Sequence, residues 1–175
     1  MNRILLLCLS LLLVGCFGSQ SASSGGSTGL FQSFYVGEEG TQYFIKPLAL
    51  KGEQDECYID FNFRSAAQLS GETTANFSFF AAQPVHKLQE AFFEVAGTRF
   101  DLQQSKSLFV ETQKDNFKCR FTSVLPTPSL KPLFATSQWK LTLIDDKGNS
   151  YHFTSDKSTE KKILTLRQRL FSIFQ

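Results

Sequence analysis

The sequence predicts a mainly β protein, and two observations support this class. The chain contains nineteen Phe residues, most of which recur at a spacing of two, the side-chain period of a β-strand. Polar turns also separate the apolar runs at short, regular intervals, as in antiparallel sandwiches. We therefore expect a β-sandwich of about eight or nine short strands, followed by a C-terminal α-helix.

Nine segments carry the alternation of apolar and polar residues that is typical of strands. The polar turns 51–56 and 66–73 divide the first three, and the next two form a hairpin about Gly97. The last two are joined by the polar turn 145–149, with Gly148 where a positive φ is favoured. The expected strands are 41–50, 57–65, 74–82, 91–96, 98–102, 108–112, 117–125, 137–144 and 150–154.

A Pro-rich segment breaks this pattern between the seventh and eighth strands. Pro126, Pro128 and Pro132 lie within seven residues, and proline cannot donate to the hydrogen-bond ladder of a central strand. We expect residues 126–132 to form a crossover between sheets.

The chain is expected to end in a helix over residues 158–174. Ser158 or Thr159 is the expected N-cap, with Glu160 in the first turn. One face is apolar and Arg167 falls inside it; its members are Ile163, Leu164, Leu166, Leu170, Phe171, Ile173 and Phe174.

Two interpretations of this helix remain open. It covers one end or face of the sandwich, with Arg167 reaching water along its stem or pairing with a carboxylate. Alternatively, it docks to a partner or to a membrane surface through Arg167, Leu170 and Phe174.

The first sixteen residues form a secretory signal that ends in a specific motif. Arg3 provides a positive start, and the apolar run 4–14 is too short for a membrane span, which needs roughly 20 residues. With Leu13-Val14-Gly15-Cys16 the chain resembles the bacterial lipoproteins and their lipobox. The resemblance implies cleavage before Cys16, a diacylglycerol thioether on its sulfur and a fatty acid such as palmitate on its new amino group. Ordinary signal cleavage, giving a secreted protein without lipid, is the alternative.

These features divide the chain into three parts. Residues 1–15 are the expected signal peptide, and residues 16–29 are the lipidated Cys and a Gly/Ser tether with a reach of about 20 Å. Residues 30–175 have the length of one domain. Acyl chains would anchor the protein in the bacterial cell envelope, and Phe17 in place of Asp after Cys16 favours the outer membrane by the same resemblance. The face of that membrane stays open.

Cysteine usage agrees with export. Cys57 and Cys119 are the pair left after Cys8 is removed and Cys16 is modified, and both share the parity of neighbouring apolar residues. We expect them to point into one core and form a disulfide. Two buried free thiols are the alternative, because parity does not establish proximity.

Other chemistry is sparse in this sequence. Two histidines, His86 and His152, and two cysteines without CxxC spacing do not supply a four-ligand metal site. No catalytic motif, cofactor motif or metal site is recognised. With 18 Lys+Arg against 16 Asp+Glu and no basic cluster, nucleic acid is not an expected partner.

A candidate binding surface comes from aromatic residues on the outward parity of the expected strands. These residues are Tyr58, Phe80, Phe92 and His152. We therefore expect a non-catalytic, membrane-anchored lipoprotein that binds another envelope protein or a glycan. An accessory or structural subunit docking through its last helix is the main alternative, and a hydrolase is the third.

Overall fold

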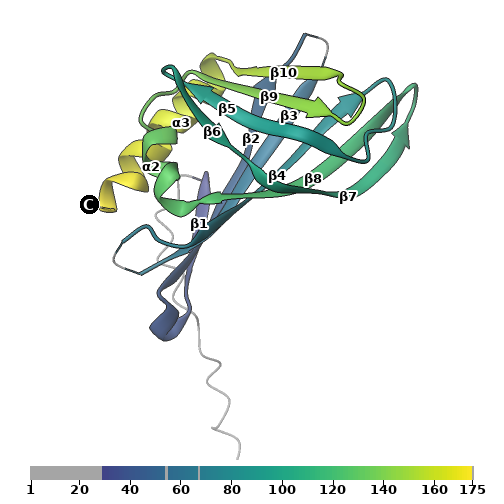
Figure 1. Ribbon diagram of the computed structural model, residues 1–175. Coiled ribbons are helices and arrows are strands. Elements are labelled where there is room, and N and C mark those ends of the chain that lie inside the picture. Colours follow the sequence, from purple (N-terminus) through teal and green to yellow (C-terminus); the bar gives the residue numbers. More distant parts are fainter. Residues whose placement is uncertain (1–28, 54, 67, 175) are drawn as a thin grey trace, which may run out of the picture.

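The computed structural model describes residues 29–53, 55–66 and 68–174, and the expected signal peptide, Cys16 and most of the tether lie outside these ranges. The ribbon in Figure 1 shows a strongly curved sheet with helices at one end. The strands are β1 Phe31–Tyr35, β2 Thr41–Lys51, β3 Glu56–Ser65, β4 Glu72–Ala81, β5 Leu88–Val95, β6 Thr98–Asp101, β7 Gln103–Gln113, β8 Asn116–Pro126, β9 Trp139–Asp145 and β10 Ser150–Ser155. The helical segments are η1 Gly37–Glu39, η2 Thr127–Ser129, α2 Leu130–Leu133, α3 Lys157–Arg169 and η3 Phe171–Ile173.

The strands form one antiparallel sheet that nearly closes on itself. Its order is β6-β5-β9-β10-β2-β3-β4-β8-β7, and β1 pairs with β2 outside this path. The two outermost strands, β6 and β7, follow one another in the chain with only Leu102 between them. Leu102 N donates to Ala91 O at 2.8 Å, which holds this junction against β5. The mainly β class and the C-terminal helix are thus confirmed.

Aromatic side chains from distant parts of the sheet fill the core. Alternate residues of β3 point inward and are fully buried, as the period of two predicts. Phe61 of β3 lies 6.2 Å, between ring centroids, from Phe93 of β5. Phe79 of β4 lies equally far from Phe153 of β10. The curved sheet therefore packs its own inner face against itself.

All nine expected strands are present, and one strand was missed. β1 follows the Gly/Ser run directly and alternates over only five residues, FQSFY, which left it without a clear period. It pairs with Thr41–Ile45 of β2, the half of that strand that β10 does not reach.

The Pro-rich segment joins β8 to β9 as expected of a crossover. It contains η2, which begins directly after Pro126, and the single turn of α2, which follows η2. Thr127 fastens it to β4, because its backbone N donates to Gly71 O at 2.9 Å and its hydroxyl lies 3.0 Å from that of Thr73.

The C-terminal helix begins earlier and ends earlier than predicted. Its N-cap is Asp156, not Ser158 or Thr159, because the Asp156 carboxylate accepts a hydrogen bond from Thr159 N at 2.8 Å. The Thr159 hydroxyl instead donates to Ala49 O of β2 at 2.5 Å. α3 ends at Arg169, and η3 follows within the range predicted to be helical to 174.

The apolar face of this helix packs on the sheet. Phe174 lies 5.5 Å from Tyr43, and Phe171 lies 6.2 Å from Phe63, both between ring centroids. Leu170 is also buried, whereas Leu164 and Ile173 of the same predicted apolar face are exposed. The helix therefore covers one end of the sheet, as the first interpretation expected.

Arg167 is exposed, as expected for a side chain that reaches water along its stem. Its Nη1 donates to the backbone oxygen of Ala135 at 2.8 Å, so the side chain meets a carbonyl and not the carboxylate of the other expectation. Because Leu170 and Phe174 are covered by the domain itself, the docking surface predicted from Arg167, Leu170 and Phe174 is not exposed in this structure.

The predicted disulfide between Cys57 and Cys119 is wrong in this structure: both are free and buried. Tyr58, next to Cys57, pairs with Ser78 of β4, and Phe79 of β4 pairs with Cys119 of β8. Strand β4 therefore lies between the two cysteines. Two strand spacings amount to about 10 Å, beyond the roughly 7 Å between Cα atoms that a disulfide bridges.

Within the described ranges, no helix is both long enough and apolar enough to span a membrane.

Candidate functional site

A cleft lies at the end of the sheet opposite to α3, where β10 begins. Its volume is about 280 Å³. Four segments contribute to it: the turn after β2, the end of β4, the start of β8 and the start of β10. The lining residues are Gly52, Glu53, Asp55, Phe80, Ala81, Ala82, Asn116, Ser150, Tyr151, His152 and Phe153.

The cleft exists because β10 joins its two neighbours unequally. β10 pairs with β9 from Ser150 to Thr154, but it pairs with β2 only at Thr154 and Ser155. The first four residues of β10 therefore do not pair with β2. The side chains of Ser150, Tyr151 and His152 line the space that this lack of pairing opens.

Aromatic rings form the apolar part of this cleft. The Tyr151 ring lies 5.1 Å from that of Phe79, which joins it to the core. Phe153 is buried beneath the turn after β2, where Gly52 lies directly against its ring. Phe80 is half-buried on the other side, at the end of β4. The rings come from β4 and β10, which β2 and β3 separate in the strand order.

A hydrogen bond from the Tyr151 hydroxyl to Asp145 orients this ring in the cleft. The Asp145 carboxylate accepts hydrogen bonds from Lys147 N at 2.9 Å, from Asn149 N at 2.8 Å and from the Tyr151 hydroxyl at 3.3 Å. Burial opposes the ionisation of Asp145, but the bonds from Asn149 and Lys147 outweigh it and lower the pKa. Burial, followed by the charge of Asp145, raises the pKa of Tyr151 to about 12. Tyr151 therefore presents a neutral phenol.

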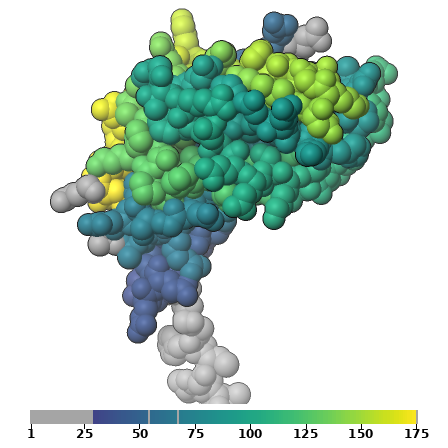
Figure 2. Space-filling model, viewed as in Figure 1, coloured from purple at the N-terminus to yellow at the C-terminus, as the bar shows by residue number. Residues whose placement is uncertain are grey.

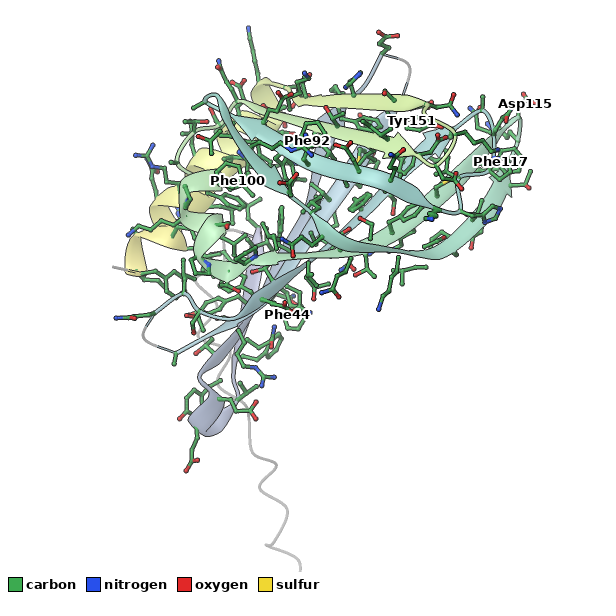
Figure 3. The ribbon with its side chains drawn as sticks, in the orientation of Figure 1. Phe44, Phe92, Phe100, Asp115, Phe117 and Tyr151 are labelled. Atoms are coloured by element: carbon green, nitrogen blue, oxygen red, sulfur yellow. The ribbon has the colours of Figure 1, made fainter. Side chains whose placement is uncertain are left out.

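A second hollow of about 250 Å³ adjoins the first. The two share Asp55, Phe80 and Asn116, so they lie side by side, and together they are called the groove below. The second hollow adds the turn between β7 and β8, with Gln113, Lys114 and Asp115. Figure 3 shows Asp115, Phe117 and Tyr151 at this same end of the molecule, away from Phe44. The lining of the groove thus combines aromatic rings with charged and amide side chains.

The four predicted surface residues do not form one patch, because the groove receives only Phe80 and His152. Tyr58 is exposed on β3, and its hydroxyl donates to Glu56. Phe92 is half-buried on β5 and is covered by Arg99, whose guanidinium carbon lies 3.6 Å above the ring centroid. A residue of the protein itself thus occupies the face of Phe92.

His152 lies in the same cleft as two carboxylates, Glu53 and Asp55, and near Ser150. Its Nδ1, however, is 3.1 Å from the hydroxyl of Thr142, which takes the position where a carboxylate would orient a catalytic histidine. No three His, Cys, Asp or Glu side chains of the described part of the chain lie close enough to hold a metal ion.

Sequence reasoning did not place Tyr151, Asp55 or Asn116 in a binding site. A usable signal was present, because Asp55 lies in the turn before β3 and Asn116 begins β8, and antiparallel strands bring such ends to one edge. Tyr151 has the inward parity of the buried Phe153, and only the short pairing of β10 with β2 brings it to a cleft.

No known protein family model, curated protein or solved structure matches this chain.

Proposed function

We propose that this protein is a lipid-anchored lipoprotein of the bacterial envelope that binds a glycan in the groove formed by β10, β4 and the adjoining turns. The observation that carries the proposal is the composition of the groove: the aromatic rings of Phe80 and Tyr151 line it together with the polar side chains of Asp55 and Asn116.

The chemistry of a sugar matches such a groove. The apolar face of a pyranose ring packs on an aromatic ring, while its hydroxyls exchange hydrogen bonds with carboxylates and amides. Asp55 accepts such bonds and Asn116 both donates and accepts them. Each of the adjoining hollows, of about 280 and 250 Å³, is close to the lower limit of small-ligand sites, which is roughly 300 Å³.

The anchor rests on the lipobox residues Leu13 to Cys16, and the outer membrane is favoured by Phe17. Two or more acyl chains on Cys16 would hold the domain stably at a membrane. A tethered binding domain then needs no spanning segment of its own to stay near an envelope glycan.

The two-layered packing of a sandwich is part of this proposal. One layer is β6-β5-β9-β10 and the other is β2-β3-β4-β8-β7, and contacts such as Phe61 with Phe93 join their inner faces. The short pairing between β10 and β2 is the seam between the layers, and the cleft lies at that seam.

Binding of soluble envelope oligosaccharides to the detergent-solubilised full chain tests the function. Phe80→Ala should weaken binding at least several-fold, because it removes one of the aromatic rings that line the groove. Phe92→Ala is the matched control, since Phe92 is an equally half-buried outward Phe whose face Arg99 covers. Equal affinities for both variants, or no binding by the unsubstituted protein, would refute the groove as a glycan site.

The anchor is tested separately by fatty-acid labelling. Cys16→Ser should abolish incorporation of an acyl probe and release the chain from the membrane fraction or leave it as precursor. Acyl label on the Cys16→Ser protein would refute the lipobox assignment.

One observation favours a hydrolase as a second candidate: His152, Ser150 and the carboxylates Glu53 and Asp55 line the same cleft. In that case the protein would cleave the bound glycan, and His152→Ala would abolish product formation while leaving binding in place. Intact oligosaccharide after prolonged incubation with the unsubstituted protein would exclude this candidate for that substrate.

A further inference from the structure

The hairpin formed by β1, η1 and β2 carries an unusual share of the exposed apolar surface. Eight large hydrophobic side chains of the described residues are exposed, and four of them belong to this hairpin: Phe34, Tyr35, Val36 and Phe44. The other four lie on four separate elements. Tyr35 is 79% exposed, and the rings of Phe34 and Phe44 meet edge to face at 5.8 Å. Single exposed apolar residues are common, but four of them within one hairpin point to a binding surface.

These side chains do not belong to the core. Their neighbour Tyr43 points to the opposite face of β2, where it is buried and stacks on Phe63 at 5.0 Å. Phe34 and Phe44 therefore lie on the outer face, where they are 42% and 39% exposed. Figure 1 and Figure 2 show the hairpin projecting from the body of the domain at its lower end.

The hairpin holds these residues in a defined geometry. β1 pairs with β2 along its whole length, and Val36 N donates to Gly40 O at 2.8 Å across the tip. Gly40 has φ 90°, and a Cβ atom there would lie 2.5 Å from Ser65 O, so this position requires glycine. The tip thus has a defined backbone, and Tyr35 and Val36 beside it are exposed.

The hairpin tip carries two acidic side chains, Glu38 and Glu39, and Arg64 of β3 forms an ion pair with Glu39. Lys46 lies at the other end of the hairpin, where its backbone N donates to Leu30 O. Exposed aromatic rings suit a membrane interface, where amphipathic rings such as that of Tyr prefer to reside.

The position of the hairpin in the chain identifies the membrane. β1 begins two residues after Gly29, and the Gly/Ser segment that the sequence predicts between Cys16 and Gly29 has a reach of about 20 Å. A five-residue strand such as β1 is about 17 Å long. The tip can therefore reach the bilayer that holds an anchor on Cys16. This step rests on the proposed lipidation.

We infer that the hairpin inserts Phe34, Tyr35, Val36 and Phe44 into the interface of the bilayer that carries the Cys16 anchor. This contact orients the domain. β2 starts at the hairpin tip and leads to Gly52 in the cleft, and its eleven residues span about 36 Å. The glycan groove then faces away from the membrane.

Site-specific labelling of the lipidated full chain in phosphatidylcholine vesicles tests this contact. Tyr35→Cys, labelled with an environment-sensitive fluorophore, should be quenched several-fold more strongly by lipids with spin-labelled acyl chains than labelled Leu108→Cys. Leu108 is the matched control, because it is an exposed apolar residue on β7. The native Cys57 and Cys119 are buried and stay unlabelled in the folded protein.

The outcomes distinguish membrane contact by the hairpin from lipid anchoring at Cys16. Vesicle flotation with equal quenching at both positions would overturn the hairpin contact and leave the anchor intact. A chain that does not float lacks the anchor, and this result overturns both. Phe34→Ser in the Tyr35→Cys chain should reduce quenching, whereas Leu164→Ser on α3 should not; equal effects of the two would also contradict the inference.

Discussion

Gly52 lies against the ring of Phe153 at the base of the cleft. A Cβ atom at position 52 would be 3.0 Å from Cδ1 and Cε1 of that ring, and equally close to Asp55 O. Gly52 N also donates to Asp55 O at 2.7 Å. The absence of a side chain thus allows the turn after β2 to close over Phe153.

Gly52→Ala should therefore destabilise the protein, because an added methyl group overpacks this contact. We expect a loss of about 1–3 kcal/mol in the free energy of unfolding, measured by urea denaturation. Phe153→Leu removes part of the opposing ring. The double variant should lose less stability than the sum of the single variants, and strictly additive losses would contradict the contact.

Asp145→Asn should change how stability depends on pH. The pKa of Asp145 is lowered in the folded state, so its stabilising contribution is fully present above the unfolded pKa, near 3.9, and is lost as pH falls through the folded value. At neutral pH the substitution should cost about 1–3 kcal/mol, because charged hydrogen bonds to Asn149 and Lys147 are lost. The difference between the two proteins should shrink below pH 4. A constant difference from pH 7 to pH 2 would exclude this role.

The thiols of Cys57 and Cys119 should be free but protected. Burial raises the pKa of both, and neither is exposed to solvent. In the lipidated protein, a thiol reagent should find no reactive group in the native state and two after denaturation without reductant. The melting temperature should not change when reductant is added. If no thiol can be titrated after denaturation, the prediction of a Cys57–Cys119 disulfide would be correct after all.

Leu170→Ala should cost about 2–5 kcal/mol in the free energy of unfolding, because Leu170 is fully buried between helix and sheet. Ile173→Ala is the matched control, since Ile173 is 57% exposed on the following turn, and should change stability by less than about 0.5 kcal/mol. Thermal and urea unfolding of both variants measure this difference. Similar small effects would instead favour a helix that leaves the sheet to dock elsewhere.

The strands could be predicted because their signal is local. Alternation over Cys57–Ser65 or Phe117–Leu125 marks a half-buried strand wherever the strand lies in the sheet. The N-cap was misplaced because Asp156, Ser158 and Thr159 all have suitable side chains, and the hydroxyl of Thr159 was taken by Ala49 O of β2.

The order of the strands in the sheet depends on contacts between residues far apart in the sequence, so it could not be predicted. Cys57 and Cys119 share a face, but parity says nothing about the strand between them. Phe92 and Phe80 are equivalent by parity. In the structure, Arg99 covers the ring of Phe92, whereas Phe80 lines the cleft. Tyr151 became a candidate only because β10 pairs with β2 at just its last two residues.

Mapping of the glycan contact by NMR tests the central claim most directly. Soluble oligosaccharides of the envelope glycan are titrated into the isotope-labelled, detergent-solubilised protein, and the backbone amide shifts are followed. The account predicts that the largest shifts cluster at Gly52, Asp55, Asn116 and His152, around the groove. Shifts confined to the hairpin or to α3, or none at saturating oligosaccharide, would contradict it.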